Sequence, residues 1–313
     1  MKIAILEKCP TKNNDMSKRI DAHSRNSYIL SNELKADLLL TKNDYLKNID
    51  KSYDVVILQT NSMGIPINYI EKIISNNLNC KKIYISNEYT TLSGGIIYKH
   101  DWGIIKNYEK TNIPKNCHNL GELNINLLFS RKPNDMCKKK YDCIYYGTFR
   151  KGRIAYFKEY LQKNIYLSTG GKGKNGNFKY FKNIGCNAKN ISKISWENKK
   201  ETLNLFNYSL YIEDEYTHSV FNNLANRWYE AGFCNNVMFF DVNCLNTIRK
   251  SEIASYEDEI MFYVVSSHAE LIEKINECNK NFEKHLNVQK HWRERELIER
   301  ENMINKLKEI IYQ

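Results

Sequence analysis

The chain has 313 residues, of which 42% are hydrophobic and 27% are charged, and these proportions exclude a disordered or fibrous chain. Its length fits two domains of roughly 150 residues each better than one small domain. A formal net charge of +11 favours polyanionic partners such as nucleic acid, an anionic membrane or phosphorylated substrates, although a lysine-rich composition alone would also account for it.

The nine cysteines are odd in number and form no CxxC pair, which argues against a disulfide or zinc framework and favours a reducing cytoplasm. Strand character begins directly after Met1 and Lys2, so no signal peptide is expected. No apolar run approaches the roughly 20 residues needed to span a bilayer. We therefore expect a soluble, cytoplasmic protein with no membrane partner.

Short apolar runs with strand character alternate with helical patterns along the chain. The predicted strands are Ile3–Leu6, Leu38–Thr41, Val55–Leu58, Ile83–Ser86, Cys143–Tyr146, Ile165–Ser168, Tyr208–Ile212, Val237–Asp241 and Met261–Val265. The predicted helices between them include Ser27–Leu34, Pro66–Asn76, Ala155–Gln162, Leu224–Ala231 and Ala269–Asn279. Strands that are apolar without alternation are typical of parallel sheets buried on both faces, so the pattern predicts an α/β fold.

Two domains are predicted, because the segment Arg131-Lys132-Pro133-Asn134 has the composition of a linker. The first domain covers residues 1–130 and the second covers residues 131–295. A charged helical tail follows, and its part over 296–313 is expected to pack back on the first domain through an apolar stripe. Two Rossmann-like domains facing a central cleft, closed by a C-terminal helix, constitute the GT-B architecture. In such folds the ligand lies outside the carboxyl ends of the strands.

The segment Tyr141–Arg153, YDCIYYGTFRKGR, predicts a strand, a glycine-containing turn and the start of a helix. Backbone N–H groups at such a turn form a cradle for phosphate, and Arg150 and Arg153 add cations with bidentate geometry. The turn lacks both the Walker ending and the spacing of a dinucleotide fingerprint. It suggests a diphosphate held by arginine, as at a nucleotide-sugar site, although an ordinary surface turn with solvated basic residues fits equally well.

A second constellation lies in the segment Phe221–Asp241, FNNLANRWYEAGFCNNVMFFD. A predicted helix ending at Ala231-Gly232 carries Arg227 and Glu230 three residues apart, on one face. Arg227 could hold a diphosphate while Glu230 accepts hydrogen bonds from ribose hydroxyls. The alternative is an exposed ion pair between these two side chains, worth a few tenths of a kcal/mol.

Together these segments resemble the phage DNA β-glucosyltransferases, a family that transfers glucose from UDP-glucose to 5-hydroxymethylcytosine in duplex DNA. The family's turn IYGGSFRSGQR corresponds to IYYGTFRKGR here, and its RVWE before a strand ending in Asp corresponds to RWYE before VMFFD. The segment FYVVSSHAELIEKINE and the opening MKIAI are also similar. The C-terminal half aligns well, whereas the N-terminal half aligns only in pattern.

The resemblance implies a donor site for UDP-glucose made by six residues: Gly147, Thr148, Arg150, Arg153, Arg227 and Glu230. Arg153 is a shifted substitute, because Ile154 occupies the column of the family's arginine. The family's catalytic Asp aligns with Glu88, or with Asn87 if the register moves by one residue.

On the acceptor side the resemblance leaves three candidates, Asp21, His23 and Arg25. Asp214, in the segment IEDEY, is a candidate ligand for an assisting Mg²⁺ or Mn²⁺ ion. The implied reaction is an inverting displacement on a base flipped out of double-stranded DNA. The lysines at 138–140, 172 and 174 are candidates for DNA contact, or are simply solvated.

A monomer in the cytoplasm of an infected bacterial host is expected. Four alternatives stay open: another UDP-sugar, 5-hydroxymethyluracil DNA as acceptor, a glycan or small-molecule acceptor, and a non-catalytic DNA-binding relative. The first two change only the donor or the base, whereas the last would retain the basic charge but lack turnover of UDP-sugar.

Overall fold

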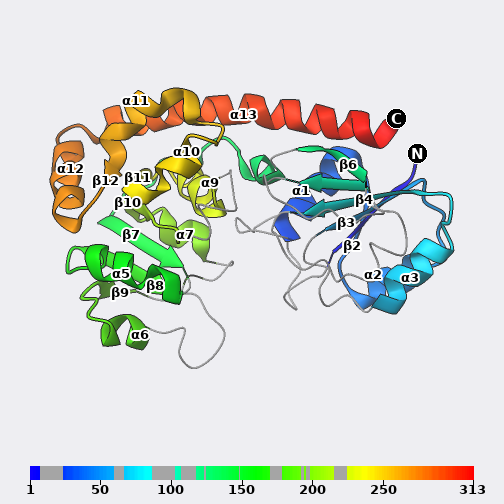
Figure 1. Ribbon diagram of the computed structural model, residues 1–313, viewed down its shortest axis with the longest axis horizontal. Helices are drawn as coiled ribbons and strands as arrows, with labels where there is room; N and C mark the ends of the chain where they lie inside the picture. The colour runs from blue at the N-terminus through cyan, green and yellow to red at the C-terminus, as the bar shows by residue number, and fades with distance from the viewer. Residues whose placement is uncertain are drawn as a thin grey trace. The chain divides into compact units, whose positions relative to one another are not determined.

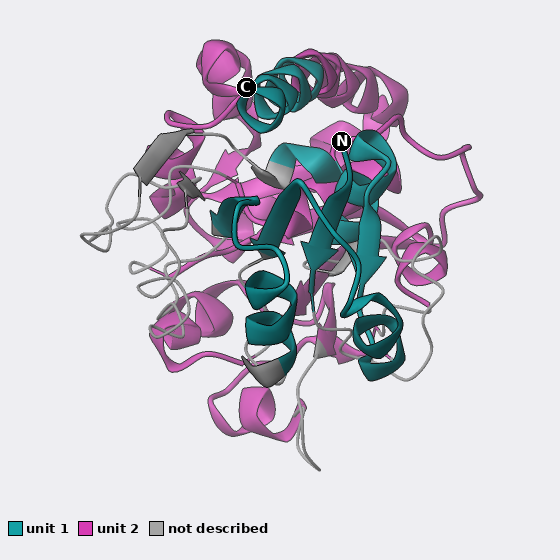
Figure 2. Ribbon diagram, turned by 90° about the vertical axis from the view of Figure 1, so that its right-hand side faces the viewer, with its two compact units in different colours: residues 1–129, 299–313 teal, residues 130–298 magenta. Residues whose placement is uncertain are grey.

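The computed structural model describes residues 1–7, 24–59, 67–86, 103–106, 118–122, 125–147, 149–169, 178–191, 194, 198–214 and 224–313. The chain divides into two compact units, one of residues 1–129 with 299–313 and the other of residues 130–298 (Figure 2). Each unit contains a six-stranded sheet with helices packed around it (Figure 1). All strand pairs in both sheets are parallel, which confirms the predicted α/β class.

The sheet of the first unit has the order β2-β1-β3-β4-β5-β6. Its strands are β1 (Ile3–Leu6), β2 (Asp37–Leu39), β3 (Val55–Gln59), β4 (Lys81–Ser86), β5 (Gly103–Lys106) and β6 (His118–Glu122). The helical segments are α1 (Ser24–Leu34), α2 (Lys42–Asn48), α3 (Ile67–Ser75) and the 3₁₀ turn η3 (Ile125–Phe129). Apolar side chains of α2 and α3, including Tyr45 and Ile73, pack on the sheet face that carries Leu6 and Val56. A capping box between Thr41 and Asp44 fixes the start of α2.

The sheet of the second unit has the order β12-β11-β10-β7-β8-β9. Its strands are β7 (Tyr141–Gly147), β8 (Ile165–Thr169), β9 (Lys189–Asn190), β10 (Phe206–Tyr211), β11 (Val237–Asp241) and β12 (Val264–Val265). The α-helices are α5 (Ile154–Tyr160), α6 (Phe178–Asn183), α7 (Lys199–Leu203), α9 (Asn226–Phe233), α10 (Leu245–Ile248), α11 (Glu257–Ile260), α12 (His268–Lys280) and α13 (Phe282–Tyr312). Four 3₁₀ turns join them, η4 (Lys151–Arg153), η5 (Val242–Cys244), η6 (Ala254–Tyr256) and η7 (Met261–Tyr263).

The order in which the strands are added to the second sheet changes direction between β7 and β10. From β7 it proceeds outward to β8 and β9, and then returns to place β10 on the other side of β7. Such a switch point separates the loops that follow the two neighbouring strands, and a crevice for ligands forms outside their carboxyl ends. A ligand site is therefore expected at the residues that directly follow β7 and β10.

Helix α13 serves both units. In the second unit the side-chain amide of Gln289 donates to Met238 O at 2.9 Å and accepts from Met238 N at 2.8 Å, as a neighbouring strand would. In the first unit Arg300 forms an ion pair with Glu33 at 2.8 Å. The C-terminal helix thus packs back on the first unit, in agreement with the predicted architecture.

Several predicted boundaries were wrong. The strand predicted over Met261–Val265 begins with the 3₁₀ turn η7 and has strand pairing only at its last two residues. Strands β5 and β6 were not predicted. Helix α9 does not end at Gly232 but continues to Phe233, and the chain turns at Asn235 with φ of 54°.

Gly232 has a packing role in α9. A Cβ atom at this position would lie 1.8 Å from the guanidinium of Arg293 on α13, so only glycine allows the two helices this contact. Among the described helices, none combines the length and the apolar content required to cross a membrane.

Candidate functional site

Two chain segments converge at the switch point of the second sheet. Strand β7 is buried from Cys143 to Tyr146, as expected for a strand covered on both faces, and it leads into Arg150 and η4. Strand β10 continues into Ile212, Glu213 and Asp214, and both carboxylates are buried. The parallel pairing of β7 with β10 brings the arginines and the carboxylates to one edge of the sheet.

Arg153 is held by two carboxylates. Its Nε donates to Asp214 Oδ2 at 3.0 Å, and its NH2 group donates to Glu213 Oε2. The side chain of Arg153 is only 5% exposed, whereas that of Arg150 is 58% exposed and lies 3.7 Å from the same oxygen of Asp214. Arg150 is therefore accessible to a ligand, while Arg153 is fixed inside the cluster.

Arg227, near the start of α9, approaches the same carboxylate from the other side. Its NH1 group donates to Glu213 Oε1 at 3.1 Å and to Ile212 O at 2.8 Å. The guanidinium lies 5.1 Å from the ring centroid of Tyr145. Burial alone would lower the pKa of Arg227, but Tyr145 and Glu213 raise it above its ordinary value, so the side chain stays charged.

Gly147 allows this arginine to lie directly against the turn. A Cβ atom at Gly147 would lie 3.2 Å from Arg227 NH2 and 3.1 Å from the Tyr145 hydroxyl, which is tighter than ordinary contact. The Nε group of Arg227 is buried and has no hydrogen-bond partner within the part of the chain that the structure describes. Arg227 thus retains donor capacity at the turn after its bonds to Glu213 and Ile212 are made.

Among the described residues of this cluster, three guanidinium groups face two carboxylates, which leaves one positive charge, and the most exposed of the three guanidinium groups is that of Arg150. Buried carboxylates that pair with arginines restrict the rotamers of those arginines, so the donors are in position before a ligand arrives. An anion with several oxygens, such as a diphosphate, fits this arrangement.

Glu230 lies one helical turn after Arg227 on α9 and is buried. Its Oε1 atom accepts from Lys199 Nζ at 2.8 Å, whereas Arg227 pairs with Glu213. The Tyr146 hydroxyl donates to Arg227 O at 3.2 Å, which ties the first turn of α9 to β7. Arg227 and Glu230 do not form the exposed pair that the sequence left open as an alternative, since both side chains are largely buried and pair with other residues.

Asp214 fits a divalent metal ion poorly. Its Oδ2 atom already accepts from Arg153 and lies near Arg150, and Glu213 is bonded to two arginines. Across the described ranges, no group of three or more His, Cys, Asp or Glu side chains could hold a metal ion.

The structure brings together Gly147, Arg150, Arg153, Asp214 and Arg227 from the predicted set, with Glu230 close by on α9. Glu88, Thr148, Asp21 and His23 lie outside the described residues. Arg25 lies on α1, and its side chain is not described.

Sequence reasoning missed Glu213 and Lys199. Two acidic residues directly after an apolar strand, in a chain of strongly positive charge, are a signal that could have identified Glu213. Nothing in the local sequence distinguishes Lys199 from the many other lysines.

The two Rossmann-like units and the C-terminal helix together constitute the GT-B fold, and solved structures similar to this chain include DNA-modifying glucosyltransferases of that fold. A DNA-modifying β-glucosyltransferase, solved with and without uridine diphosphoglucose, matches with a TM-score of 0.72 and 17% identity over 100% of both chains. The β-glucosyltransferase of T4 phage in complex with UDP and Mn²⁺ matches with a TM-score of 0.68 and 16% identity over 99% of both chains. An α-glucosyltransferase in complex with UDP-glucose and abasic DNA matches with a TM-score of 0.60 and 12% identity over 100% of both chains.

No protein-family model matches the chain. No curated protein matches it either.

Proposed function

We propose that this chain is a UDP-sugar-dependent glycosyltransferase that transfers glucose from UDP-glucose to the hydroxymethyl group of 5-hydroxymethylcytosine in phage duplex DNA. The observation that carries this proposal is the arginine cluster at the switch point of the second sheet, in a chain with the GT-B fold. Solved glucosyltransferases of the same fold bind UDP-glucose, and one binds DNA as well.

In this proposal the second unit binds the donor. Arg150 and Arg227 bind the diphosphate, Arg153 orients the carboxylates and borders the site, and Glu230 accepts from the ribose hydroxyls. Gly147 and Thr148 supply the turn. Charge-assisted bonds from guanidinium groups to phosphate are short and directional, so they fix the donor as well as bind it.

The first unit, which includes the end of α13, supplies the residues that bind and activate the acceptor. Glu88 removes the proton from the hydroxymethyl oxygen, which attacks the anomeric carbon of the sugar as its bond to UDP breaks, with inversion at that carbon. The negative charge that develops on UDP is stabilised by Arg150 and Arg227. A general base contributes roughly 10²–10⁴-fold to such a rate.

The target base must leave the duplex to reach this site, as base-modifying enzymes require. Asp21, His23 and Arg25 are the candidates for contact with the flipped base. The net charge of +11 serves contacts to DNA phosphates, so binding should weaken steeply as salt rises. We propose a monomer that acts in the cytoplasm of the infected bacterial host.

The test is analysis of the product. Duplex DNA containing 5-hydroxymethylcytosine is incubated with the protein and UDP-glucose, digested to nucleosides and examined by mass spectrometry and by NMR of the anomeric proton. A hexose in β-linkage on the modified nucleoside supports the proposal. Transfer only from another UDP-sugar, only to 5-hydroxymethyluracil, or only to a glycan would contradict the stated donor or acceptor, and DNA binding without any transfer would favour a non-catalytic relative.

A further inference from the structure

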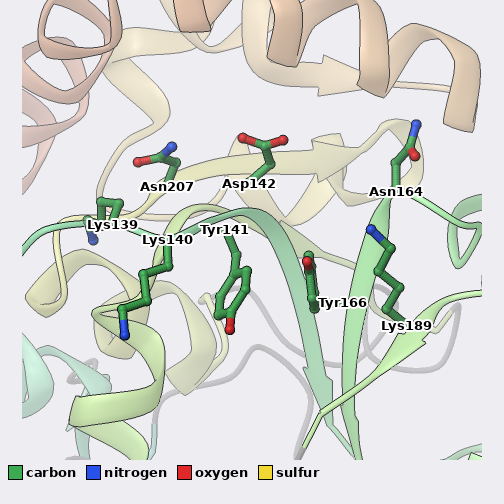
Figure 3. Close-up of a pocket in the computed structure, with 8 residues that line it drawn as sticks. All are labelled: Lys139, Lys140, Tyr141, Asp142, Asn164, Tyr166, Lys189 and Asn207. Atoms are coloured by element: carbon green, nitrogen blue, oxygen red, sulfur yellow. The ribbon is translucent and has the colours of Figure 1, made fainter.

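A polar pocket lies at the other end of the same sheet from the arginine cluster. Its volume is about 290 Å³. Lys140 and Tyr141 stand at the amino end of β7, and Asn164 directly precedes β8 (Figure 3). Because β7 has seven residues at about 3.3 Å each, roughly 20 Å separates this pocket from Gly147. The pocket is therefore distinct from the proposed donor site.

Cations dominate the lining of this pocket. Lys139, Lys140 and Lys189 contribute to it, against a single carboxylate, Asp142. Lys139 donates to Cys234 O at 2.7 Å, and burial lowers its pKa to about 8. This lysine is therefore less available to a ligand than the other two. Lys140 and Lys189 are exposed and are the cations available to a ligand. Two lysines at one pocket favour a phosphate group.

An aromatic surface lies between these lysines. The ring of Tyr141 is 4.7 Å from that of Tyr166 and 5.2 Å from that of Phe206, and Tyr141 is 37% exposed. Lys189 Nζ lies 5.2 Å from the centroid of the Tyr166 ring. A tyrosine that is held by ring contacts on its inner side and open on the other can stack on a planar ring of a ligand.

A row of hydrogen-bonding groups completes the pocket. Asn207, Asp142 and Asn164 line the pocket as well, from the neighbouring strands β10 and β7 and the residue before β8 (Figure 3). A carboxylate would repel a simple anion, but it accepts hydrogen bonds from amino or hydroxyl groups. The ligand should therefore combine a phosphate with a planar ring and with hydrogen-bond donors.

We propose that this pocket binds one phosphorylated nucleoside unit, with its base against Tyr141 and its phosphate at one of the two lysines that flank the rings, Lys140 or Lys189. Its volume lies at the lower end of the range for ligand pockets, which suits one nucleotide rather than a duplex. The unit can belong to a single strand of nucleic acid or be a free nucleotide. The inference does not depend on the proposed transfer reaction.

The test compares two double variants of the full chain, both of which keep the donor site unchanged. Lys140→Ala with Lys189→Ala removes the pocket cations, and Lys280→Ala with Lys284→Ala removes two exposed lysines of α12 and α13 as a matched control. Binding of a labelled single-stranded oligonucleotide is followed by fluorescence anisotropy at several salt concentrations. The pocket variant should bind about tenfold more weakly, with a salt slope smaller by about one unit, while the control should match the wild type. Equal oligonucleotide affinities for the two double variants would exclude a strand as the source of the unit, and equal affinities for a free nucleotide as well would overturn the proposal.

Two further arms define the ligand. Calorimetry with a free nucleoside monophosphate shows whether the pocket needs a strand, and inorganic phosphate shows whether it needs the base. Nucleotide or oligonucleotide binding that is lost in the pocket variant supports the proposal, whereas phosphate binding as tight as nucleotide binding contradicts it. Tyr141→Leu keeps an apolar side chain against Phe206 and should abolish the quenching of a 2-aminopurine base in the oligonucleotide; unchanged quenching would contradict stacking.

Discussion

Arg153 and Arg227 share the carboxylate of Glu213, although they come from different elements, η4 and α9. Arg227 NH1 lies 3.1 Å from Glu213 Oε1, and Arg153 bonds the other oxygen of the same group. This relationship sets both guanidinium groups at the switch point before a donor binds. It also means that loss of either arginine leaves part of a buried carboxylate without its partner.

Replacement of Arg227 by alanine should weaken UDP binding roughly 10–100-fold, because a charge-assisted donor to the diphosphate is lost. Arg227→Lys should recover only part of this affinity, since lysine lacks the planar fork. Isothermal titration with UDP measures the effect, on variants whose thermal unfolding confirms that they are folded. Arg249→Ala, which breaks an exposed ion pair with Glu257, is the control and should bind UDP as the wild type does. Equal UDP affinity in Arg227→Ala would exclude this arginine from the donor site.

Gly147→Ala should weaken UDP binding about tenfold while leaving the fold intact. The added methyl group would meet Arg227 NH2 at 3.2 Å and would displace the guanidinium from the turn. Gly152→Ala is the matched control, because its Cβ atom would lie at an ordinary 3.4 Å from Asp214 Cβ. Titration with UDP measures the affinity of both variants. An equal loss of affinity in the two would refute the role given to Gly147.

Glu88→Gln should lower the transfer rate by roughly 10²–10⁴-fold and leave UDP affinity unchanged, because a general base acts on the acceptor and not on the donor. Asn87→Ala distinguishes the two possible registers and should have a much smaller effect. Single-turnover transfer measures the chemical step directly. Full activity of Glu88→Gln would remove this residue from the mechanism.

A buried carboxylate on α13 should make stability fall as the pH rises. Glu296 accepts from Trp228 Nε1 and from Ser130 Oγ, the latter at 3.3 Å, and it is 2% exposed. Burial raises the pKa of Glu296 to about 8; Arg293 opposes this shift and Glu252 adds to it. The folded state therefore holds a proton that the unfolded state loses, and stability decreases between pH 4.5 and about 8.

Glu296→Gln should flatten this dependence, because an amide keeps the acceptor oxygen for Trp228 but does not titrate. Chemical denaturation below pH 4.5 and near pH 8 measures the free energy of unfolding of both proteins. The wild type should lose stability relative to the variant as the pH rises. Parallel curves would show that Glu296 titrates normally in the folded protein.

The α/β class and most strands could be predicted because buried parallel strands are short, apolar and free of alternation. Val237–Asp241 was predicted with its observed bounds, and it is buried along its whole length. Strands β5 and β6 could not be predicted in this way, since GIIK and HNLGE contain glycine or polar residues and lack that signature. Tertiary pairing with β4 and with each other forms them.

The arginines of the candidate site could be predicted from the sequence, but their pairing with carboxylates could not. The turn pattern after β7 identified Gly147, Arg150 and Arg153, because sequence spacing reports local geometry. The bonds of Arg153 to Glu213 and Asp214 depend on β10 lying beside β7, which local sequence does not encode. Gly232 was assigned to a helix end, yet its role depends on Arg293, which approaches from another helix.

Release of UDP from UDP-glucose is the most direct test of the central claim. The reaction is run with duplex DNA that contains 5-hydroxymethylcytosine, with the matched unmodified duplex and without DNA. We predict release that requires the modified duplex and that is strongly reduced by Arg227→Ala. No release with the modified duplex, or equal release with all three, would contradict the account of this protein as a DNA glucosyltransferase.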